Sequence, residues 1–446
     1  MLKTHIIGNK SDIYGVPLPD NLSKFVDKIP IELSFVLDKI SEHGGVWIVG
    51  GAVRDAAIGV FPDDIDLATD LLPEKILNIF PNSIETGVAF GTVTVKSGKY
   101  LFQITTLRTD GKYLDNRRPE SVIWNNSLKN DLERRDFTIN SMAIDVARRL
   151  FYDPHNGLND IENGIIRCVG NATKRISEDG LRILRAYRFL GHRGNNLWKM
   201  DKSLQNAINI NSFMLENLAK ERIWQEFKKI LNSKLSNEIL IEMLQNGVLE
   251  NILSNKITSQ LQLIKALKSA EKLDYISLFC LINHNLEKYK IIEICKKLKM
   301  SNAELKNISE RFQYIGYTPE DSISELRLFR FILSEKWQQQ LLLEINLRSN
   351  SLIEFDAKFD ANYINEIFQQ ISKLKPLTHE KQLVDGNWIM NSTNIEQGKR
   401  LGRLKEWLFK LQVQNDLTSM AEIELLLCKI NWNEKDFSNW PKLSIL

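Results

Sequence analysis

The stretch IVGGAVRDAAIGVFPDDIDLAT, residues 48–69, decides the fold of the N-terminal part of the chain. Its first apolar run ends at two glycines, and the acids Asp64 and Asp66 follow at alternate positions. On a β-strand, residues i and i+2 point to the same face, so we expect both carboxylates on one side and Ile65 on the other. Two such carboxylates repel each other unless a cation lies between them. The pattern therefore predicts that Asp64 and Asp66 bind a hard divalent ion such as Mg²⁺.

The glycine pair predicts a phosphate-binding turn between a strand and a helix. Gly50 and Gly51 close the strand VWIV, and a helix can begin at once with Ala52. Glycine lets the backbone approach a phosphate, and Arg54, one turn into the helix, adds a positive charge. Each pattern alone has a simpler interpretation, a plain turn for Gly-Gly and a solvated strand edge for D-x-D. Their order and spacing together indicate nucleotidyl transfer, in which metal ions hold the attacking and leaving oxygens in line.

The composition is that of an ordinary globular protein. The 446 residues are 43% hydrophobic and 26% charged, which is enough for roughly three domains. The four cysteines are scattered without a CxxC pair, which argues against structural zinc and favours buried thiols in a reducing compartment. No apolar run approaches the ~20 residues needed to cross a bilayer, and no signal-peptide segment is evident. We therefore expect a cytoplasmic protein without a membrane partner. Its net charge of +3 is compatible with a local polyanion-binding patch.

The periodicity of the sequence changes once along the chain. Up to about residue 150, short β-type runs surround a helical segment that begins at Pro73. From about Ser177 onward, amphipathic stretches of helical period follow one another with almost no strand signal and no fixed repeat. This order predicts an α+β fold, with a small head whose sheet carries the two acids and a long helical body. The expected strands are 45–50, 64–70, 91–97 and 100–107.

The order of the motifs resembles one family. GGAVRD (50–55) followed by DDIDLATD (63–70) is similar to the opening motif of the class II tRNA nucleotidyltransferases, the CCA-adding enzymes, and of their poly(A) polymerase relatives. The similarity is dense from about residue 45 to residue 231 and thin beyond, where GKRLGRLKEWL (398–408) resembles a family tail element. Five further segments follow in the family's order: the flexible loop (105–119), the ribose-binding segment (132–145), the hinge (153–167), the base-reading helix (175–189) and the helix after it (220–231).

The resemblance implies an architecture and an activity. A polymerase-β-like nucleotidyltransferase head with a small mixed sheet is expected at 1–150, a neck with the base-reading helix at 151–235, a helical body at 236–330 and a tRNA-docking tail at 331–446. The implied reaction is template-independent addition of C and A to the 3′ end of tRNA, with CTP and ATP as substrates and Mg²⁺ as cofactor. No phosphohydrolase motif accompanies the six histidines, so no second hydrolytic domain is expected.

The same resemblance assigns polar residues to the nucleotide. In RRDFTIN, Arg135 offers a guanidinium fork to triphosphate oxygens, and Asp136 with Asn140 can bond sugar hydroxyls. Phe137 and Ile139 in this segment have the pattern of core residues. The residues expected to hold phosphate or sugar are Gly51, Arg54, Arg135, Asp136, Asn140, Arg185 and Arg188.

The base-reading helix is expected to begin at Ser177 as N-cap. Its arginines could simply form the basic face of an amphipathic helix. However, Asp179 and Arg182 stand one turn apart and offer an acceptor beside a donor. Cytosine and adenine expose an amino donor beside a ring-nitrogen acceptor, whereas uracil and guanine present the reverse order. The pair would therefore admit C and A and reject U and G, at about 1–3 kcal/mol for each unsatisfied polar group.

Other segments carry weaker assignments. The flexible loop, with Arg117 and Arg118, is expected to rearrange the site between nucleotides. The basic groups 296–299 and 399–403 are candidates for tRNA contact, although a charge run is usually a solvated face. Two positions depart from the family pattern: Gln103 stands where a third acid is common, and Gly180 stands where proline is common.

Close alternatives share this chemistry. A member of the family can add only the two Cs, only the final A, or a poly(A) tail, and the sequence does not choose among them. The intact loop favours a full or A-adding enzyme. A catalytically inactive RNA-binding module is the alternative from another class, and the retained Asp64 and Asp66 argue against it.

Overall fold

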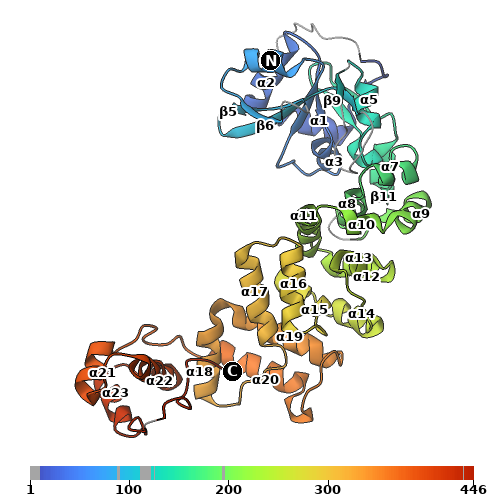
Figure 1. The fold of residues 1–446 in the computed structure, drawn as a ribbon. Helices are drawn as coiled ribbons and strands as arrows, with labels where there is room; N and C mark the ends of the chain where they lie inside the picture. Colours follow the sequence, from blue (N-terminus) through green and yellow to red (C-terminus); the bar gives the residue numbers. More distant parts are fainter. Residues whose placement is uncertain are drawn as a thin grey trace. The chain divides into compact units, whose positions relative to one another are not determined.

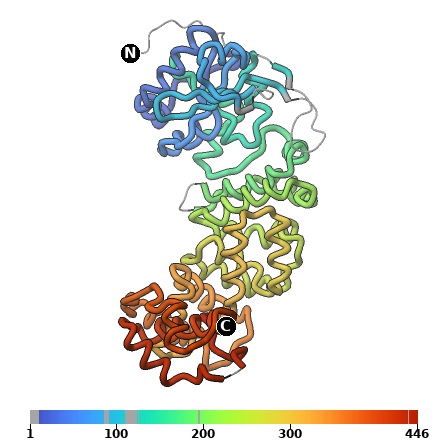
Figure 2. The backbone as a smooth tube through the Cα atoms, turned by 60° about the vertical axis from the view of Figure 1, so that its left-hand side comes forward, coloured from blue at the N-terminus to red at the C-terminus, as the bar shows by residue number. Residues whose placement is uncertain are grey.

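The computed structural model describes residues 11–87, 91–110, 122–124, 126–192, 196–434 and 436–445 (Figures 1 and 2). The chain forms two compact units, Met1–Lys256 and Ile257–Leu446. The boundary between them falls inside the range expected for the helical body. The division into head, neck, body and tail therefore stays a prediction.

The first unit begins with an eight-stranded mixed sheet, which confirms the predicted head. The central strand β3 (Asp66–Thr69) pairs antiparallel with β2 (Val46–Val49) and parallel with β6 (Tyr100–Thr106). Alternation of buried and exposed residues explains β6, where Phe102 and Ile104 face the core and Leu101 and Gln103 do not. In order across the sheet, the strands are β1 (Val16–Pro17), β10 (Leu150–Tyr152), β9 (Ala143–Asp145), β2, β3, β6, β5 (Thr92–Ser97) and β4 (Ile84–Gly87).

Short helices connect these strands and extend the first unit. Two two-stranded pairs, β7 (Arg108–Asp110) with β8 (Val122–Trp124) and β11 (Ile165–Ile166) with β12 (Lys199–Met200), lie outside the main sheet. Pro73 begins α4, as predicted. The helices of the head are α1 (Asp20–Val26), α2 (Ile31–Ser41), α3 (Gly51–Ala57), α4 (Pro73–Ile79), α5 (Leu128–Glu133), the 3₁₀ turn η2 (Thr138–Asn140) and α6 (Gly157–Asn163).

The rest of the first unit is helical. The core here is made by large side chains such as Tyr187, Phe189 and Phe227, all almost completely buried. Residues 237–253 do not form one continuous helix, because Gly247, with φ 67°, interrupts it. The helices are α7 (Ala172–Glu178), α8 (Leu181–Leu190), α9 (Lys202–Asn211), α10 (Met214–Asn217), α11 (Lys220–Leu231), α12 (Ser236–Gln245) and α13 (Val248–Leu253).

The second unit is made of helices, with two core clusters of its own. One gathers around Phe329 and Leu341 and the other around Leu404 and Ile423. The helices are α14 (Gln260–Lys268), α15 (Tyr275–Ile282), α16 (Lys288–Lys297), α17 (Asn302–Gln313), α18 (Ile323–Leu333), α19 (Trp337–Ser349), α20 (Ala361–Lys373), α21 (Gly386–Thr393), α22 (Lys399–Asn415) and α23 (Met420–Leu427), with 3₁₀ turns η3 (Ser334–Lys336) and η4 (Ala357–Phe359).

Two predictions from composition can be compared with the fold. Three of the four cysteines are buried thiols, as expected, but Cys428 is exposed, because it follows the short helix α23 at the surface. Within the described ranges, no helix is both long enough and apolar enough to cross a bilayer.

Candidate active site

The two acids lie at the start of β3. Asp66 is the first residue of the strand and Asp64 precedes it. Both are exposed, while Ile65 between them is buried. Desolvation by the surrounding protein raises the pKa of Asp66, the charge of Asp64 raises it further, and Arg135 lowers it. Asp64 and Asp66 therefore lie on one side of the sheet and feel each other's charge. Two carboxylates in this arrangement fit a hard divalent cation.

The strand register places Gln103, which stands where a third acid is common in the family, beside Asp66. Gln103 of β6 lies directly beside Asp66 of β3, and its side chain is exposed. It occupies the place of a third acid but brings an amide without charge. Across the described part of the chain, no group of three or more His, Cys, Asp or Glu side chains could hold a metal. A cation at this site would therefore take its remaining ligands from water or from phosphate oxygens, as Mg²⁺ commonly does.

The glycine turn lies next to these acids. Val49, the last residue of β2, is paired with Asp66, so the turn that follows it reaches the same end of the sheet. Gly50 has φ 73°, a left-handed conformation that favours glycine, and α3 begins at Gly51. A Cβ added to Gly50 would lie 2.8 Å from Nη1 of Arg135. Glycine is thus required both by the backbone conformation and by the close approach of this guanidinium group.

Arg135 lies beside the glycine turn and Asp66. Its Nη2 donates to Oδ2 of Asp131 at 3.0 Å, and its Nε is buried without a hydrogen-bond partner in the described residues. The guanidinium group lies between the glycine turn and Asp66, whose pKa it lowers. An unpaired donor beside two acids and a turn is suited to a triphosphate oxygen.

Arg54 is enclosed by protein partners. Its side chain is only 10% exposed, and burial lowers its pKa. Nη1 donates to Oδ1 of Asn140 at 2.5 Å, Nη2 lies 2.9 Å from Oδ1 of Asp55, and the guanidinium lies 4.8 Å from the ring centroid of Phe189. Arg54 therefore joins α3 to the η2 turn and to α8.

Asp136 and Asn140 continue this network. The carboxylate of Asp136 accepts from Nδ2 of Asn140 at 3.0 Å, from the backbone N–H of Phe137 at 2.8 Å, and from Nε and Nη2 of Arg185 at 2.8 and 2.5 Å. Burial would raise its pKa, but Arg185 and these donors outweigh burial and hold the pKa far below the usual value. The ribose-binding residues of the prediction are thus bound to one another and to the arginine-bearing helix.

The expected start of the base-reading helix at Ser177 is wrong. Ser177 belongs to the last turn of α7, where its hydroxyl donates to the carbonyl of Lys174. Asp179 is extended, and α8 begins after Gly180. Gly180 also lies close to α10, because a Cβ at this position would lie 3.0 Å from Cβ of Met214. Glycine therefore fits this contact more easily than the proline common in the family, because proline would add a Cβ.

Asp179 and Arg182 are both held by protein partners. Oδ2 of Asp179 accepts from Nη2 of Arg222 on α11 at 2.9 Å, and Oδ1 accepts from the N–H of Leu181 at 3.0 Å. Nη1 of Arg182 donates to Oε2 of Glu178 at 2.7 Å. The sequence analysis did not single out Arg222 or Glu178, although each lies inside a motif that it quoted.

Phe189 and His192 are two more residues that the sequence analysis missed. The guanidinium carbons of Arg54, Arg185 and Arg188 lie 4.8, 5.7 and 4.2 Å from the Phe189 ring centroid, and Nε of Arg188 bonds Glu226 at 2.7 Å. Nε2 of His192 lies 2.8 Å from Oδ1 of Asp55. Spacing offers a signal for Phe189, since residues 185 and 189 lie on one side of α8.

The remaining candidates are only partly described. Arg117 and Arg118 of the flexible loop lie outside the described residues. Lys296, Lys297 and Lys299 are exposed at and after the end of α16. In the group at 399–403, Arg400 donates to the carbonyls of residues 432 and 434, and Arg403 pairs with Glu406.

Two protein-family models match segments of this chain, and known proteins are similar to it over most of its length. Residues 46–167 match a family described as the poly A polymerase head domain, and residues 199–258 match one described as a probable RNA and SrmB-binding site of polymerase A. The CCA-adding enzyme of Ligilactobacillus salivarius is 32% identical over 89% of this chain and 96% of its own length. That of Pediococcus pentosaceus is 35% identical over 90% and 97%.

Solved structures agree with the fold. The Bacillus stearothermophilus CCA-adding enzyme in complex with CTP has a TM-score of 0.70 at 23% identity, over 92% of this chain and 98% of its own. The Thermotoga maritima CCA-adding enzyme complexed with tRNA has a TM-score of 0.65 at 19% identity, over 92% and 98%. At these identities the two structures show that the fold is shared.

Proposed function

The chain belongs to the family of CCA-adding enzymes, and from this premise we infer that it adds C and A nucleotides to the 3′ end of tRNA. CTP and ATP are the proposed substrates, and no nucleic-acid template is involved. The observation that supports this function best is the gathering of Asp64, Asp66, the Gly50 turn and Arg135 at one end of the sheet.

In the proposed reaction, Asp64 and Asp66 hold Mg²⁺ on the side of the sheet to which both carboxylates point. The bound metal would lower the pKa of the terminal tRNA hydroxyl and offset charge on the triphosphate. Arg135 offers its guanidinium group to a phosphate oxygen, and glycine at position 50 allows this group to lie close to the turn. Asp136, Asn140 and Arg54 fix the position of Arg185 through the hydrogen bonds described above.

The base is selected by Asp179 and Arg182 in this proposal. A carboxylate oxygen can accept more than one hydrogen bond, so Asp179 can keep its bond to Arg222 and still accept from the amino group of cytosine or adenine. Arg182 donates to the adjacent ring nitrogen. Arg222 and Glu178 act as positioning residues because each holds one member of the pair and touches no base itself.

RNA docking is proposed for the helical part of the chain. The match of residues 199–258 to a family described as a probable RNA-binding site supports this for the end of the first unit. Lysines 296, 297 and 299 are proposed phosphate contacts in the second unit, since structured RNA is gripped largely through phosphates and shape.

The test is incorporation by the purified protein into three tRNAs, one lacking CCA, one ending after the first C and one ending after both Cs. With CTP or ATP supplied singly, CTP should extend the first two RNAs and ATP only the third. A protein that adds only Cs, only the last A, or a long A tail would contradict full CCA addition and identify the alternative. Asp64→Ala should abolish incorporation and leave tRNA binding intact, whereas undiminished turnover would refute the metal assignment.

A further inference from the structure

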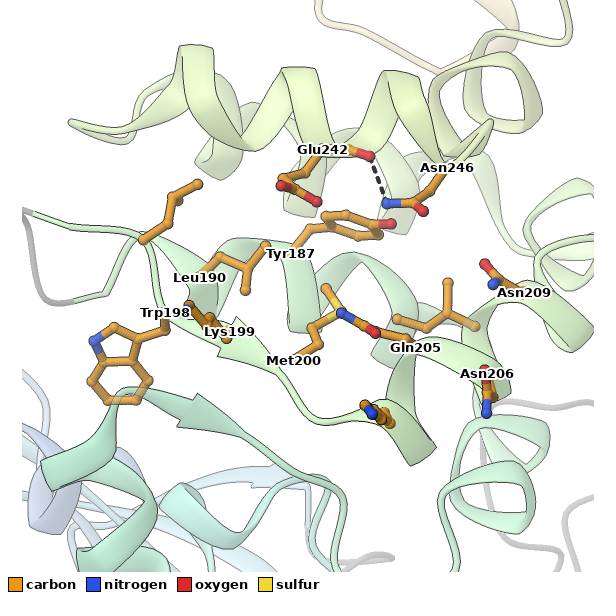
Figure 3. A pocket seen from close by; sticks show the side chains of 13 residues that line it. Tyr187, Leu190, Trp198, Lys199, Met200, Gln205, Asn206, Asn209, Glu242 and Asn246 are labelled. Atoms are coloured by element: carbon orange, nitrogen blue, oxygen red, sulfur yellow. Dashed lines mark hydrogen bonds between the residues drawn. The ribbon is translucent and has the colours of Figure 1, made fainter.

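A cavity in the first unit lies behind the arginine-bearing helix α8. It has a volume of about 570 Å³ and is bounded by α8, β12, α9 and α12. Figure 3 shows Tyr187 at its centre, with Glu242 and Asn246 on one side and Met200 and Gln205 on the other. Its volume falls in the range of about 300–1,000 Å³ that is typical of small-molecule pockets. We call it the α8–α9 pocket.

Helix geometry separates this pocket from the candidate active site. With about 100° per residue, Tyr187 and Leu190 lie about 200° and 140° around α8 from Arg185. Both residues line the pocket. Arg185 and Arg188 lie on the opposite side of the helix, where they reach Asp136 and Glu226. Helix α8 therefore separates the arginines expected to bind the nucleotide from the pocket.

The mouth of the pocket carries polar side chains with no partner in the described part of the chain. Gln205, Asn206 and Asn209 of α9 are exposed and make no side-chain hydrogen bond with the described residues. Each carboxamide offers an acceptor and two donors, which is the combination found on the edge of a nucleobase. Lys199 and Lys202 stand beside them, exposed and without an ion-pair partner among the described residues. Together these groups offer base-edge recognition next to positive charge.

The floor of the pocket is fixed and partly apolar. The ring of Tyr187 and the side chain of Leu190 are almost completely buried, and the Tyr187 hydroxyl is hydrogen-bonded to Asn246. Asn246 in turn donates to the carbonyl of Glu242 at 2.8 Å. An occupant would therefore meet a surface that does not need to reorganise, while the amides at the mouth are free to adapt.

We propose that the α8–α9 pocket binds one unpaired nucleotide of the RNA substrate, with the carboxamides of α9 on its base and Lys199 and Lys202 on the flanking phosphates. Two separate lysines at an open mouth suit a chain with a phosphate on each side of the nucleotide. The inference rests on the proposed function only in taking RNA as the ligand, since the pocket shares no lining residue with the catalytic centre.

The experiment measures binding of a fluorescein-labelled, unstructured six-nucleotide RNA by fluorescence anisotropy, with EDTA present to keep the catalytic centre free of metal. The full-length protein is compared with Asn206→Ala/Asn209→Ala, Gln205→Ala and Lys199→Ala. Asn82→Ala and Lys28→Ala are the matched controls, because both residues are exposed, lie in the same unit outside the segment 199–258 and do not line the pocket. All the altered side chains are exposed, so the thermal unfolding curves should stay unchanged.

The double amide variant should raise the Kd about tenfold or more, which corresponds to the loss of one or two hydrogen bonds. Lys199→Ala should reduce the slope of log Kd against log salt by about 0.7, the value for one single-strand phosphate. Both controls should match the unaltered protein, and the KM for CTP should be the same in every variant. Equal Kd values in the pocket variants and the controls would overturn the proposal.

Competition with free CMP and AMP distinguishes the source of the nucleotide. Mononucleotide binding that depends on the pocket, with RNA affinity unchanged by the same variants, would overturn the assignment to RNA. Failure of the proposed function is recognised separately, because it appears as absent CTP incorporation by the unaltered protein. Pocket-dependent RNA binding in that situation would still support the pocket.

Discussion

Replacement of Arg222 by Met tests whether this residue positions the base-reading carboxylate. The change removes the 2.9 Å bond from Nη2 to Oδ2 of Asp179, two side chains that are 23% and 16% exposed. A hydrogen bond to a charged group contributes about 1.5–3 kcal/mol, which corresponds to a factor of about 10–150 in rate. The buried Nη1 of Arg222 has no partner in the described residues, so its removal leaves no new unsatisfied group there.

The assay is single-nucleotide incorporation into tRNA lacking CCA, with kcat/KM measured for CTP and for UTP. We expect kcat/KM for CTP to fall by about 10–150-fold in Arg222→Met, and the preference for CTP over UTP to fall with it, because a carboxylate held only by the N–H of Leu181 rejects a carbonyl less well. Arg222→Lys should lose less, since it keeps the charge and loses only the fork geometry. Gln225→Met, an exposed position on the same helix, is the control.

The reasoning would be refuted by one combination of results. If Arg222→Met keeps the rate with CTP and its selectivity while Asp179→Ala loses both, then Asp179 reads the base without being held by Arg222. A loss of folding is checked separately by the thermal unfolding of each variant.

The other predictions concern the centre of the site. Asp66→Asn should lower incorporation by about 10³-fold or more with unchanged tRNA affinity, because a metal ligand contributes several kcal/mol of charge stabilisation; near-normal incorporation would exclude the assignment. Gly50→Ala should raise the KM for CTP and lower the Tm, since it combines the cost of φ 73°, about 1–2 kcal/mol, with displacement of Arg135. Asp136→Asn should destabilise the protein at pH 7 by about 3–5 kcal/mol, because every contact of that carboxylate is a donor and Arg185 loses its partner. The folded pKa of Asp136 lies below its ordinary 3.8, so its stabilisation is present above that pH and is lost as the pH falls through the folded pKa; urea unfolding should show a smaller difference from the unaltered protein at pH 3 than at pH 7.

Local pattern was sufficient to predict the part of the fold that holds the acids. Strands β2, β3, β5 and β6 lie within one or two residues of their expected ranges, because each is a short apolar run bounded by glycine or charged turns. The side shared by Asp64 and Asp66 follows from the period of a strand alone. The strands β9 and β10 were not predicted, since AID and LFY are too short to give a periodic signal.

Partners across the fold could not be predicted in the same way. The break between α7 and α8 falls at the extended residue Asp179, which is bound by Arg222, 43 positions later in the sequence. Similarly, the spacing in GGAVRD indicates a positive charge at Arg54 but cannot show that Asn140, Asp55 and Phe189 enclose it. Residue type gave the chemistry of the site, while the partner of each charge is set by tertiary packing.

The Asp and Glu side chains that pair with the arginines of the site affect which ligands can bind there. Among the described residues, each arginine expected to touch an incoming nucleoside triphosphate already forms a salt bridge within the protein. Attraction by bulk charge is therefore weak, and a polyanion of the wrong shape gains little by entering. Selection among ligands depends instead on whether a ligand can replace each of these salt bridges with a contact of its own in the right geometry. The salt bridges are Arg54 with Asp55, Arg135 with Asp131, Arg182 with Glu178, Arg185 with Asp136 and Arg188 with Glu226.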